Sequence, residues 1–462
     1  MSTQSAGGHG SENILRTVWR LAWPAVALNL LQVVNMLLDT AFVGRLEPAA
    51  LTAVGGSTNV VFLMFSIVMA FSTSATALVS RSFGARKQNR LRVANRQCLS
   101  VALVAGVVCC ALTIAGAGWS AHTLLPADAL RAKTLMVHYL VAMAVGLPGM
   151  FLVQALAGSL RGIGDTRSPL VISGIQILLH IALNYVLIFP ATDFHGVQIP
   201  GAGWGLAGAG WAVTISAWVS AAIYMAWVSQ TPLGSCWRFV VPTLKWTRRI
   251  VGIAAPATVM SVVRVSSLWA FTKILSQVPS GATAIGAMSA GFRIESIMFM
   301  PAFGLSIAAA ALVGQSLGAQ QPERAERIGW VSAHCAAGVI LAVAGLVFAF
   351  AHDIASQLVP RQPEAAVMIA TFLRYLCVTE VMFGYAMVLM GAMQGAGDTE
   401  RPMWATVISL WGMRVPMAFV CALVLKMGAD GAWLAMSATQ AVQGLLTMLL
   451  FKQGKWKDRK VL

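Results

Sequence analysis

Charged residues are scarce in this sequence, and their scarcity excludes most classes of water-soluble protein. Asp, Glu, Lys and Arg make up only 10% of the 462 residues, whereas a soluble protein carries about 25% because it must present a wetted surface. Hydrophobic residues make up 58%, and the mean hydropathy is +0.75. Most of the molecular surface must therefore contact something other than water, and the relevant unit is the helix of about 20 apolar residues that spans a bilayer.

Motifs for metal binding, redox chemistry and nucleotide hydrolysis are also missing. The seven cysteines show no metal-ligand spacing and no paired framework, and His, Asp and Glu form no cluster at ligand spacing within the apolar stretches. The chain contains no Walker A sequence, so we do not expect it to hydrolyse ATP itself. We therefore predict that it is not an enzyme, that it has no catalytic residues and that it binds no metal or cofactor.

Apolar stretches long enough to cross a membrane divide the whole chain. We predict that they are helices, because backbone groups in lipid must be satisfied within their own segment and the runs are too long for barrel strands. The predicted fold is an all-α polytopic membrane protein with twelve transmembrane helices, which cover residues 21–43, 58–80, 97–118, 134–157, 169–189, 205–228, 250–275, 284–313, 328–350, 370–392, 403–425 and 430–451.

Lys and Arg residues are distributed very unevenly between the two sides of this arrangement. If the N-terminus is cytoplasmic, 22 of the 32 fall on the inner side, five on the outer side and five within apolar stretches. The positive-inside rule then places both termini and the segments 81–96 and 229–249 in the cytoplasm of a cell with a bacterial-type inner membrane. The net charge of +16 is thereby explained by membrane topology, and we expect no nucleic-acid partner. Residues 1–15 are polar and do not have the pattern of a cleavable signal peptide. We expect them to form a disordered cytoplasmic leader.

The sequence repeats itself at an offset of 232 to 234 residues. Val79-Ser-Arg-Ser-Phe-Gly-Ala85 matches Val313-Gly-Gln-Ser-Leu-Gly-Ala319, and Pro24 matches Pro256. A third match joins Gly158-Ser-Leu-Arg-Gly-Ile-Gly-Asp-Thr166 to Gly391-Ala-Met-Gln-Gly-Ala-Gly-Asp-Thr399. We therefore predict two pseudo-symmetric six-helix lobes at 16–235 and 250–452, with a cytoplasmic linker at 236–249 and a basic cytoplasmic tail at 453–462. Repeats of the same orientation indicate a transporter with its substrate cavity between the lobes, and we expect it to be a monomer.

Asp165 and Asp398 occupy equivalent positions in the repeated Gly-X-Gly-Asp-Thr elements. Glycine permits the closure of a helix, and Asp can cap the helix that follows. Both residues are predicted to be helix caps, and a role in gating is the alternative.

Taken together, these elements resemble the multidrug and toxic compound extrusion (MATE) transporters, and the resemblance covers nearly the whole chain. It rests on the paired elements above and on Trp23-Pro24, Asp39-Thr-Ala-Phe-Val-Gly44, Arg293-Ile-Glu295 and Arg414-Val-Pro416. The resemblance implies a V-shaped antiporter that exports cationic or amphipathic compounds in exchange for H⁺ or Na⁺, with small organic compounds and membrane lipid as its partners. The alternative is a flippase for a lipid-linked oligosaccharide precursor, from the same superfamily. A wide basic cavity would favour the flippase, and Asp39 disfavours it.

Asp39 is the carboxylate that lies well inside an apolar stretch of the first half. An ionisable residue at the centre of a membrane helix costs about 2.5–3.5 kcal/mol and is by default a functional candidate. The resemblance places the family's first-helix aspartate here, so Asp39 is the predicted ion-coupling residue. The alternative is an aspartate at a helix end near the outer interface. His180 and Asn184 are one turn apart on one face. Family members often have Asn and Asp at these positions, which form a polar network with the first-helix aspartate, so the resemblance makes His180 and Asn184 further coupling candidates.

The second half contains several ionisable residues within apolar stretches. Arg293 and Glu295 are two residues apart, so they must point to different faces of a helix. We expect Arg264 or Arg414 to form a structural ion pair across helices with Glu295 or Glu380, and Glu380 is the preferred second functional acid.

The choice of coupling ion depends on two positions. Members that resemble the sodium-coupled branch carry a glutamate and an aspartate where this chain has Arg264 and Phe383. A cation at the first of these positions would repel Na⁺, and the chain resembles the DinF-like branch instead. H⁺ is therefore the predicted coupling ion, while Glu380, one turn from Phe383, leaves Na⁺ open.

Overall fold

The computed structural model describes residues 14–194, 197–237 and 239–459, and within them twelve helices are long and apolar enough to cross a membrane. Every predicted span corresponds to one of them, and the eleventh is built from four successive segments, α12 to η2. The elements are α1 (Ile14–Val43), α2 (Pro48–Gly84), α3 (Gln88–Leu124), α4 (Leu130–Gly162), α5 (Arg167–Ile188), β1 (Pro190–Phe194), β2 (Val197–Ala202), α6 (Leu206–Ser229), α7 (Leu244–Leu275), α8 (Gly281–Gly318), α9 (Pro322–Ala349), α10 (Ala351–Leu358), α11 (Pro363–Gly395), α12 (Glu400–Val407), η1 (Ile408–Arg414), α13 (Val415–Phe419), η2 (Val420–Val424) and α14 (Gly428–Lys452).

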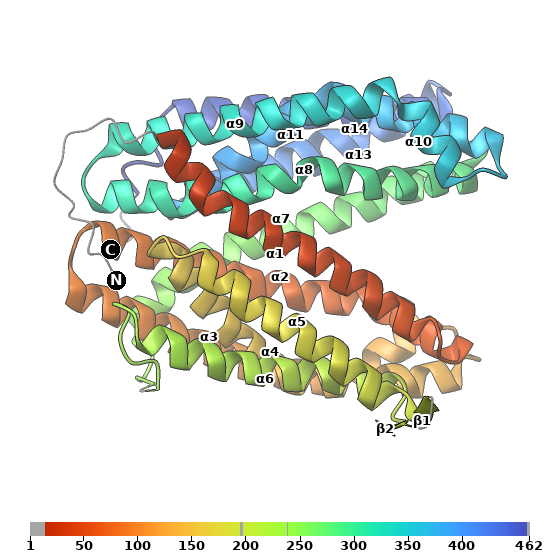
Figure 1. Cartoon of the computed structure of the whole chain (residues 1–462). Helices are drawn as coiled ribbons and strands as arrows, with labels where there is room; N and C mark the ends of the chain where they lie inside the picture. The colour runs from red at the N-terminus through yellow and green to blue at the C-terminus, as the bar shows by residue number, and fades with distance from the viewer. Residues whose placement is uncertain (1–13, 195–196, 238, 460–462) are drawn as a thin grey trace.

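A short β-hairpin departs from the all-helical prediction, and the short helix α10 lies outside the predicted spans. Strands β1 and β2 pair antiparallel between α5 and α6. The chain then turns into α6 through Gly203 and Gly205, whose φ angles of +64° and +57° favour glycine. The hairpin lies at one end of the molecule (Figure 1) and leaves the twelve-helix architecture unchanged.

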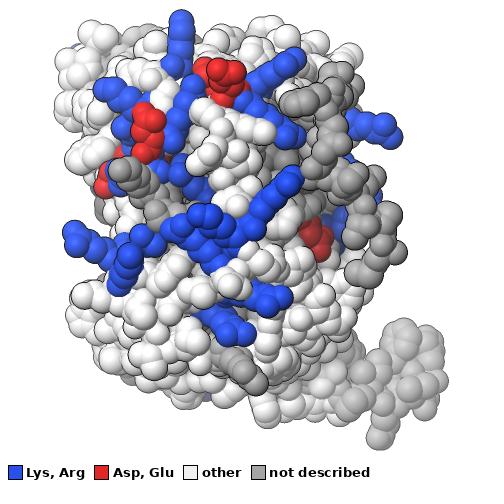
Figure 2. Space-filling model, turned by 90° about the vertical axis from the view of Figure 1, so that its left-hand side faces the viewer, with Lys and Arg blue, Asp and Glu red and all other residues white. Residues whose placement is uncertain are grey.

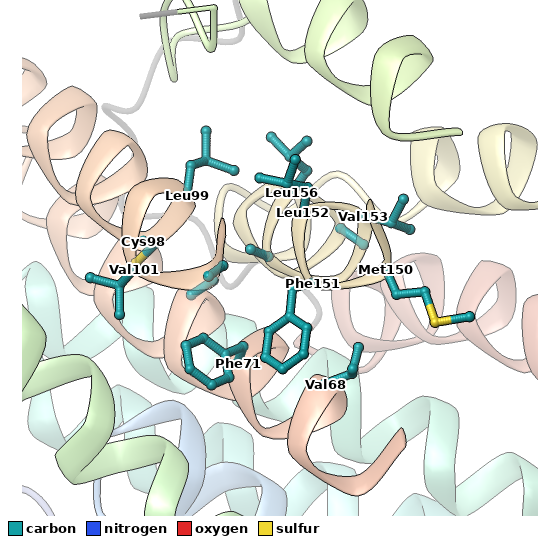
Figure 3. Packing of buried hydrophobic residues seen from close by; sticks show 14 of the residues in the cluster. Val68, Phe71, Cys98, Leu99, Val101, Met150, Phe151, Leu152, Val153 and Leu156 are labelled. Atoms are coloured by element: carbon teal, nitrogen blue, oxygen red, sulfur yellow. The ribbon is translucent and has the colours of Figure 1, made fainter. Parts of the chain in front are cut away.

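The helices form two bundles that lie close together at one end and diverge toward the other (Figure 1). Helices α2 to α6 form one bundle and α8 to α14 the other. In the first bundle, Phe71 of α2 meets Phe151 of α4 edge to face, with ring centroids 5.0 Å apart. Leu99 of α3 belongs to the same buried cluster (Figure 3). Close helix packing of this kind, rather than a hydrophobic effect between helices, holds a bundle together in lipid.

Helices α1 and α7 contact both bundles, which the predicted lobe boundaries did not anticipate. The first turns of α1, including Val18 and Leu21, belong to a buried cluster with Leu305 of α8, while the rest of the helix runs to α5 in the other bundle (Figure 1). Helix α7 does the converse, because Ile250 and Ile253 near its start lie in the core of the α2–α6 bundle. Each sequence repeat therefore contributes the first part of one helix to the opposite lobe.

Lys and Arg gather on the end where the bundles lie close together, which we call the basic end (Figure 2). Helix α1 starts there, α14 ends there, and the loops α2–α3 and α6–α7 lie on the same side (Figure 1). The predicted leader lies outside the described residues except for Ile14 and Leu15, which open α1. Arg238 and residues 460–462 are also outside them.

The tail after α14 packs against its own lobe. The Trp456 side chain is fully buried and stacks on Phe451, with ring centroids 4.6 Å apart. Its indole N–H donates to the Phe451 carbonyl (2.8 Å), and Lys457 forms an ion pair with Glu326 of α9 (2.5 Å). The described part of the tail is therefore an integral part of the lobe.

Candidate functional site

Asp39 is the centre of a polar network that joins α1 to α5. Its Oδ1 atom accepts a hydrogen bond from Asn184 Nδ2 (2.7 Å) and lies 3.0 Å from His180 Nε2. Its Oδ2 atom accepts from Asn35 Nδ2 (3.3 Å), one turn earlier on α1. His180 and Asn184 share one face of α5, as their spacing predicts, and are 3.1 Å apart. The structure therefore brings the three predicted residues of the first half together.

The network is partly exposed and partly buried within the protein. The Asp39 side chain is 37% exposed, whereas that of His180 is 7% exposed. The buried atoms His180 Nδ1 and Asn184 Oδ1 have no hydrogen-bond partner among the described residues. These free positions leave the network able to exchange its hydrogen bonds. Asn35 was missed by the sequence argument, although its spacing of four residues from Asp39 could have revealed it.

The acids of the second half form a separate cluster inside the α8–α14 bundle. Glu295 of α8 accepts a hydrogen bond from Gln440 of α14 (3.2 Å) and interacts electrostatically with Glu380. Gln440 in turn accepts from Thr379 of α11 (3.2 Å). Glu380 is fully buried, and neither of its carboxyl oxygens has a hydrogen-bond partner among the residues described. A proton bound to either acid would relieve the repulsion between the two buried carboxyl groups.

The direct ion pairs expected for this half are not formed in the described part of the chain. Arg414 interacts with Glu295 electrostatically, but its Nε donates to Thr439 (3.1 Å). Arg414 is the last residue of η1, a π-helical segment. Such a segment changes the direction of the side chains that follow it and is frequent at functional sites. Arg293 is exposed while Glu295 is buried, so the prediction that they face different ways is confirmed.

A cavity of about 180 Å³ lies between the lobes. It is lined by α2, α7, α8 and α11, and its walls combine methionines and Phe303 with small polar side chains such as Ser66 and Ser261. Arg264 is the charged residue among those that line it. A cavity is therefore present between the lobes, where the substrate site was predicted, but Asp39 and Glu380 do not line it.

Backbone contacts close the space between the lobes at the basic end. A Cβ atom on Gly84 would lie 1.9 Å from the Gln315 carbonyl oxygen, and one on Gly318 would lie 2.2 Å from the Arg81 carbonyl oxygen. Gln315 also donates its Nε2 to the Gly162 carbonyl (2.9 Å). The two copies of the repeated Val79–Ala85 motif thus pack against each other with no room for side chains.

Asp165 and Asp398 follow glycines in the left-handed region, Gly164 and Gly397, with φ angles of +87° and +84°. Asp165 Oδ1 accepts from the backbone N–H of Arg167 (3.1 Å) and of Ser168 (3.0 Å), which is the geometry of a helix cap. The buried Asp398 accepts a hydrogen bond from the Arg401 backbone N–H (3.5 Å) and forms an ion pair with the Arg401 guanidinium group.

No group of three or more His, Cys, Asp or Glu residues within the described ranges is placed to hold a metal ion. The Glu295–Glu380 cluster offers carboxyl and amide oxygens of the type that hard cations prefer. The Arg414 guanidinium interacts electrostatically with Glu295 and opposes the binding of a metal cation there.

Comparison with known proteins gives one consistent result. The MatE family model matches residues 24–186 and 256–420, which are the two repeats. The chain is 29% identical to a probable multidrug resistance protein NorM of Thermotoga maritima, covering 97% of this chain and 94% of that protein. It is 26% identical to the probable multidrug resistance protein YoeA of Bacillus subtilis, over 96% of each.

The fold is also found among solved structures. A structure described as the outward-facing conformation of a multidrug resistance MATE family transporter superposes with a TM-score of 0.86, at 19% identity and over 97% of both chains. A MATE structure in complex with MaL6 also superposes with a TM-score of 0.86, over 95% of this chain and 96% of that one, at 20% identity. Because the family model matches most of the chain and covers both repeats, this protein belongs to the multidrug and toxic compound extrusion (MATE) family.

Proposed function

We propose that this protein is a secondary active antiporter that exports amphipathic organic compounds in exchange for protons, with Asp39 as the coupling residue. The observation that carries the proposal is the set of three side chains that converge on the Asp39 carboxyl from α1 and α5. Names of relatives such as NorM support export of toxic compounds. The basic end is the cytoplasmic side in this proposal, because Lys and Arg predominate there (Figure 2).

Protonation of Asp39 would act on the attachment of α1 to α5. Hydrogen bonds to a charged group contribute about 1.5–3 kcal/mol each, and an uncharged carboxyl holds the same donors less strongly. Helix α1 belongs to both lobes, since its first turns pack on α8. Loosening its attachment to α5 would therefore change how the two lobes are held together, which is the movement that alternating access requires.

In this proposal Asp39 exchanges protons through the exposed part of its side chain, which amounts to 37%. A cationic group that reached it would favour its ionised form and compete with the proton. Cationic compounds therefore remain among the proposed substrates.

The Glu295–Glu380 cluster is the alternative coupling site. It is buried, and no described residue forms a hydrogen bond with the Glu380 carboxyl group, so the cluster would need a path to solvent that opens during transport. The flippase alternative predicts a wide basic cavity, whereas the inter-lobe cavity has one charged lining residue, Arg264.

The test uses inside-out membrane vesicles, in which respiration generates an acid interior. Addition of a transported amphipathic compound, either a cationic one such as ethidium or an acidic one such as dansylglycine, should release protons from wild-type vesicles, measured as dequenching of a pH-sensitive acridine dye. Asp39→Asn should abolish this release, because the amide cannot take up a proton. Glu47→Gln is the matched control, since Glu47 is an exposed acid in the α1–α2 loop, paired with Arg131. Normal proton release by well-expressed Asp39→Asn would remove Asp39 from the mechanism.

A further inference from the structure

The cavity between the lobes contains a positive charge without a protein counter-ion. Arg264 of α7 is an exposed residue that lines the cavity, although it lies within a membrane span. Among the described residues none forms an ion pair or a hydrogen bond with its guanidinium group. The adjacent cation Arg414 interacts electrostatically with both Arg264 and Glu295. The neighbouring acid is thus associated with Arg414, and Arg264 remains uncompensated.

The other acids of the spans do not compensate this charge. Asp39 is engaged with α5 in the other lobe, at His180 and Asn184. Glu380 is fully buried inside its own bundle and does not line the cavity. On the basic-end side, the Arg161 side chain donates to the Ser72 hydroxyl, next to the cavity-lining Thr73. Arg161 is thus hydrogen-bonded within its own lobe and supplies no negative charge to Arg264.

The remaining walls suit an amphipathic ligand. Ser66, Ser261 and Gln394 offer hydroxyl and amide groups, while Met260 and Met390 offer flexible apolar surface that repacks around ligands of different shape. A guanidinium group binds a carboxylate or a phosphate through two parallel hydrogen bonds, and such a bond is strengthened where water is restricted. The site thus combines one anchor for an acidic group with an adaptable apolar surface.

We propose that the inter-lobe cavity binds small amphipathic compounds that carry an acidic group, such as a carboxylate or a sulfonate, and that Arg264 is the residue that selects them. This inference rests on the proposed transport function and narrows its substrate class. An unpaired charge within a membrane span is costly and commonly marks a substrate pathway. Here the counter-charge is supplied by the substrate. A cation without an additional acidic group is disfavoured in this cavity because it would approach Arg264 without compensation.

The test compares two probes with the same fluorophore and opposite charge, dansylglycine and dansylethylenediamine. The purified full-length protein is reconstituted in proteoliposomes, and an acid interior drives accumulation by the inside-out molecules. Wild type should accumulate dansylglycine, and Arg264→Gln should lower the uptake ratio of dansylglycine to dansylethylenediamine at least tenfold. Arg264→Lys, which keeps the charge but not the fork of donors, should retain an intermediate ratio.

Lys273→Gln is the matched control. Lys273 is an exposed cation on the same helix, in a separate groove between α7 and α13, so its loss should leave the ratio at the wild-type value. Elution as a single peak in gel filtration shows that each variant is folded.

The other outcomes separate the two proposals. Gradient-driven uptake of dansylethylenediamine without dansylglycine would overturn the inference while leaving the transport function intact. An unchanged ratio in Arg264→Gln would also overturn it. Uptake of neither probe would contradict the transport function together with the inference. Flipping of fluorescently labelled phosphatidylglycerol that depends on Arg264, without dansylglycine uptake, would assign the cavity to an anionic lipid and overturn the choice of a small soluble compound.

Discussion

The contact between Gly84 of α2 and Gln315 of α8 holds the two lobes together at the basic end. Disrupting it should shift the equilibrium from molecules closed at that end to molecules open there. A Cβ atom at Gly84 would lie 1.9 Å from the Gln315 carbonyl oxygen and 2.7 Å from the carbonyl carbon, whereas real Cβ contacts essentially never fall below 3.0 Å. Both atoms belong to the backbone, so no side chain can rotate away. In Gly84→Ala the basic ends of the two helices must separate by at least about 1 Å, and the closed contact between the lobes is lost.

The size of the effect follows from the cost of overpacking, which is about 1–3 kcal/mol. This strain is present only while the basic end is closed, so it shifts the ratio of closed to open molecules by about 5- to 150-fold. If the basic end is cytoplasmic, Gly84→Ala favours the inward-facing state. Gly55→Ala is a suitable control on the same helix, because a Cβ there meets no heavy atom within 4 Å.

The assay is the accessibility of a single cysteine in the cavity. Ser261→Cys, introduced on a cysteine-free background, places a thiol on the lining of the inter-lobe cavity. In inside-out vesicles, an impermeant maleimide should modify it faster in Gly84→Ala than in Gly55→Ala, by a factor within the range above. Equal rates in the two variants would refute the role of this contact as the closure between the lobes.

Further predictions concern the stability of the basic end. Trp456→Ala should lower the melting temperature of the detergent-solubilised protein by several degrees, because truncating a buried Trp costs about 3–5 kcal/mol. Trp269→Ala, at a position that is 70% exposed, should leave it nearly unchanged, and equal melting temperatures would contradict the docking of the tail. Asp165→Ala should cost about 1 kcal/mol, as expected for loss of a cap. Asp398→Ala should cost more, because it also leaves Arg401 without its buried partner. A larger fall in melting temperature for Asp165→Ala than for Asp398→Ala would contradict this order.

The number of helices and the internal repeat could be predicted because both are patterns of the sequence itself and do not depend on which helices touch. Hydropathy over about 20 residues marks a span wherever it packs, and the spacing of His180 and Asn184 puts them on one face. Their meeting with Asp39 followed from the family resemblance, since no local signal relates α1 to α5. The β-hairpin was missed because its strands are short and lie between two spans.

Features that depend on which helices touch could not be predicted. The packing of α1 and α7 on both lobes depends on tertiary contacts such as that of Val18 with α8. The predicted ion pair of Glu295 is not formed, because Gln440 occupies the hydrogen-bonding position at its carboxyl group. Gln440 is distant from Glu295 in the sequence, so no local pattern could reveal this contact. The burial of Trp456 was hidden by the basic residues around it, which indicate a solvated tail.

The central claim is that protons drive export through Asp39, and it is tested most directly in proteoliposomes with each ion gradient imposed alone. A pH gradient without Na⁺ should drive efflux of a loaded dye from wild type and from Glu380→Gln, and Asp39→Asn should abolish it. Efflux driven by a Na⁺ gradient at constant pH, retained in Asp39→Asn and lost in Glu380→Gln, would contradict the claim and place coupling in the α8–α14 bundle.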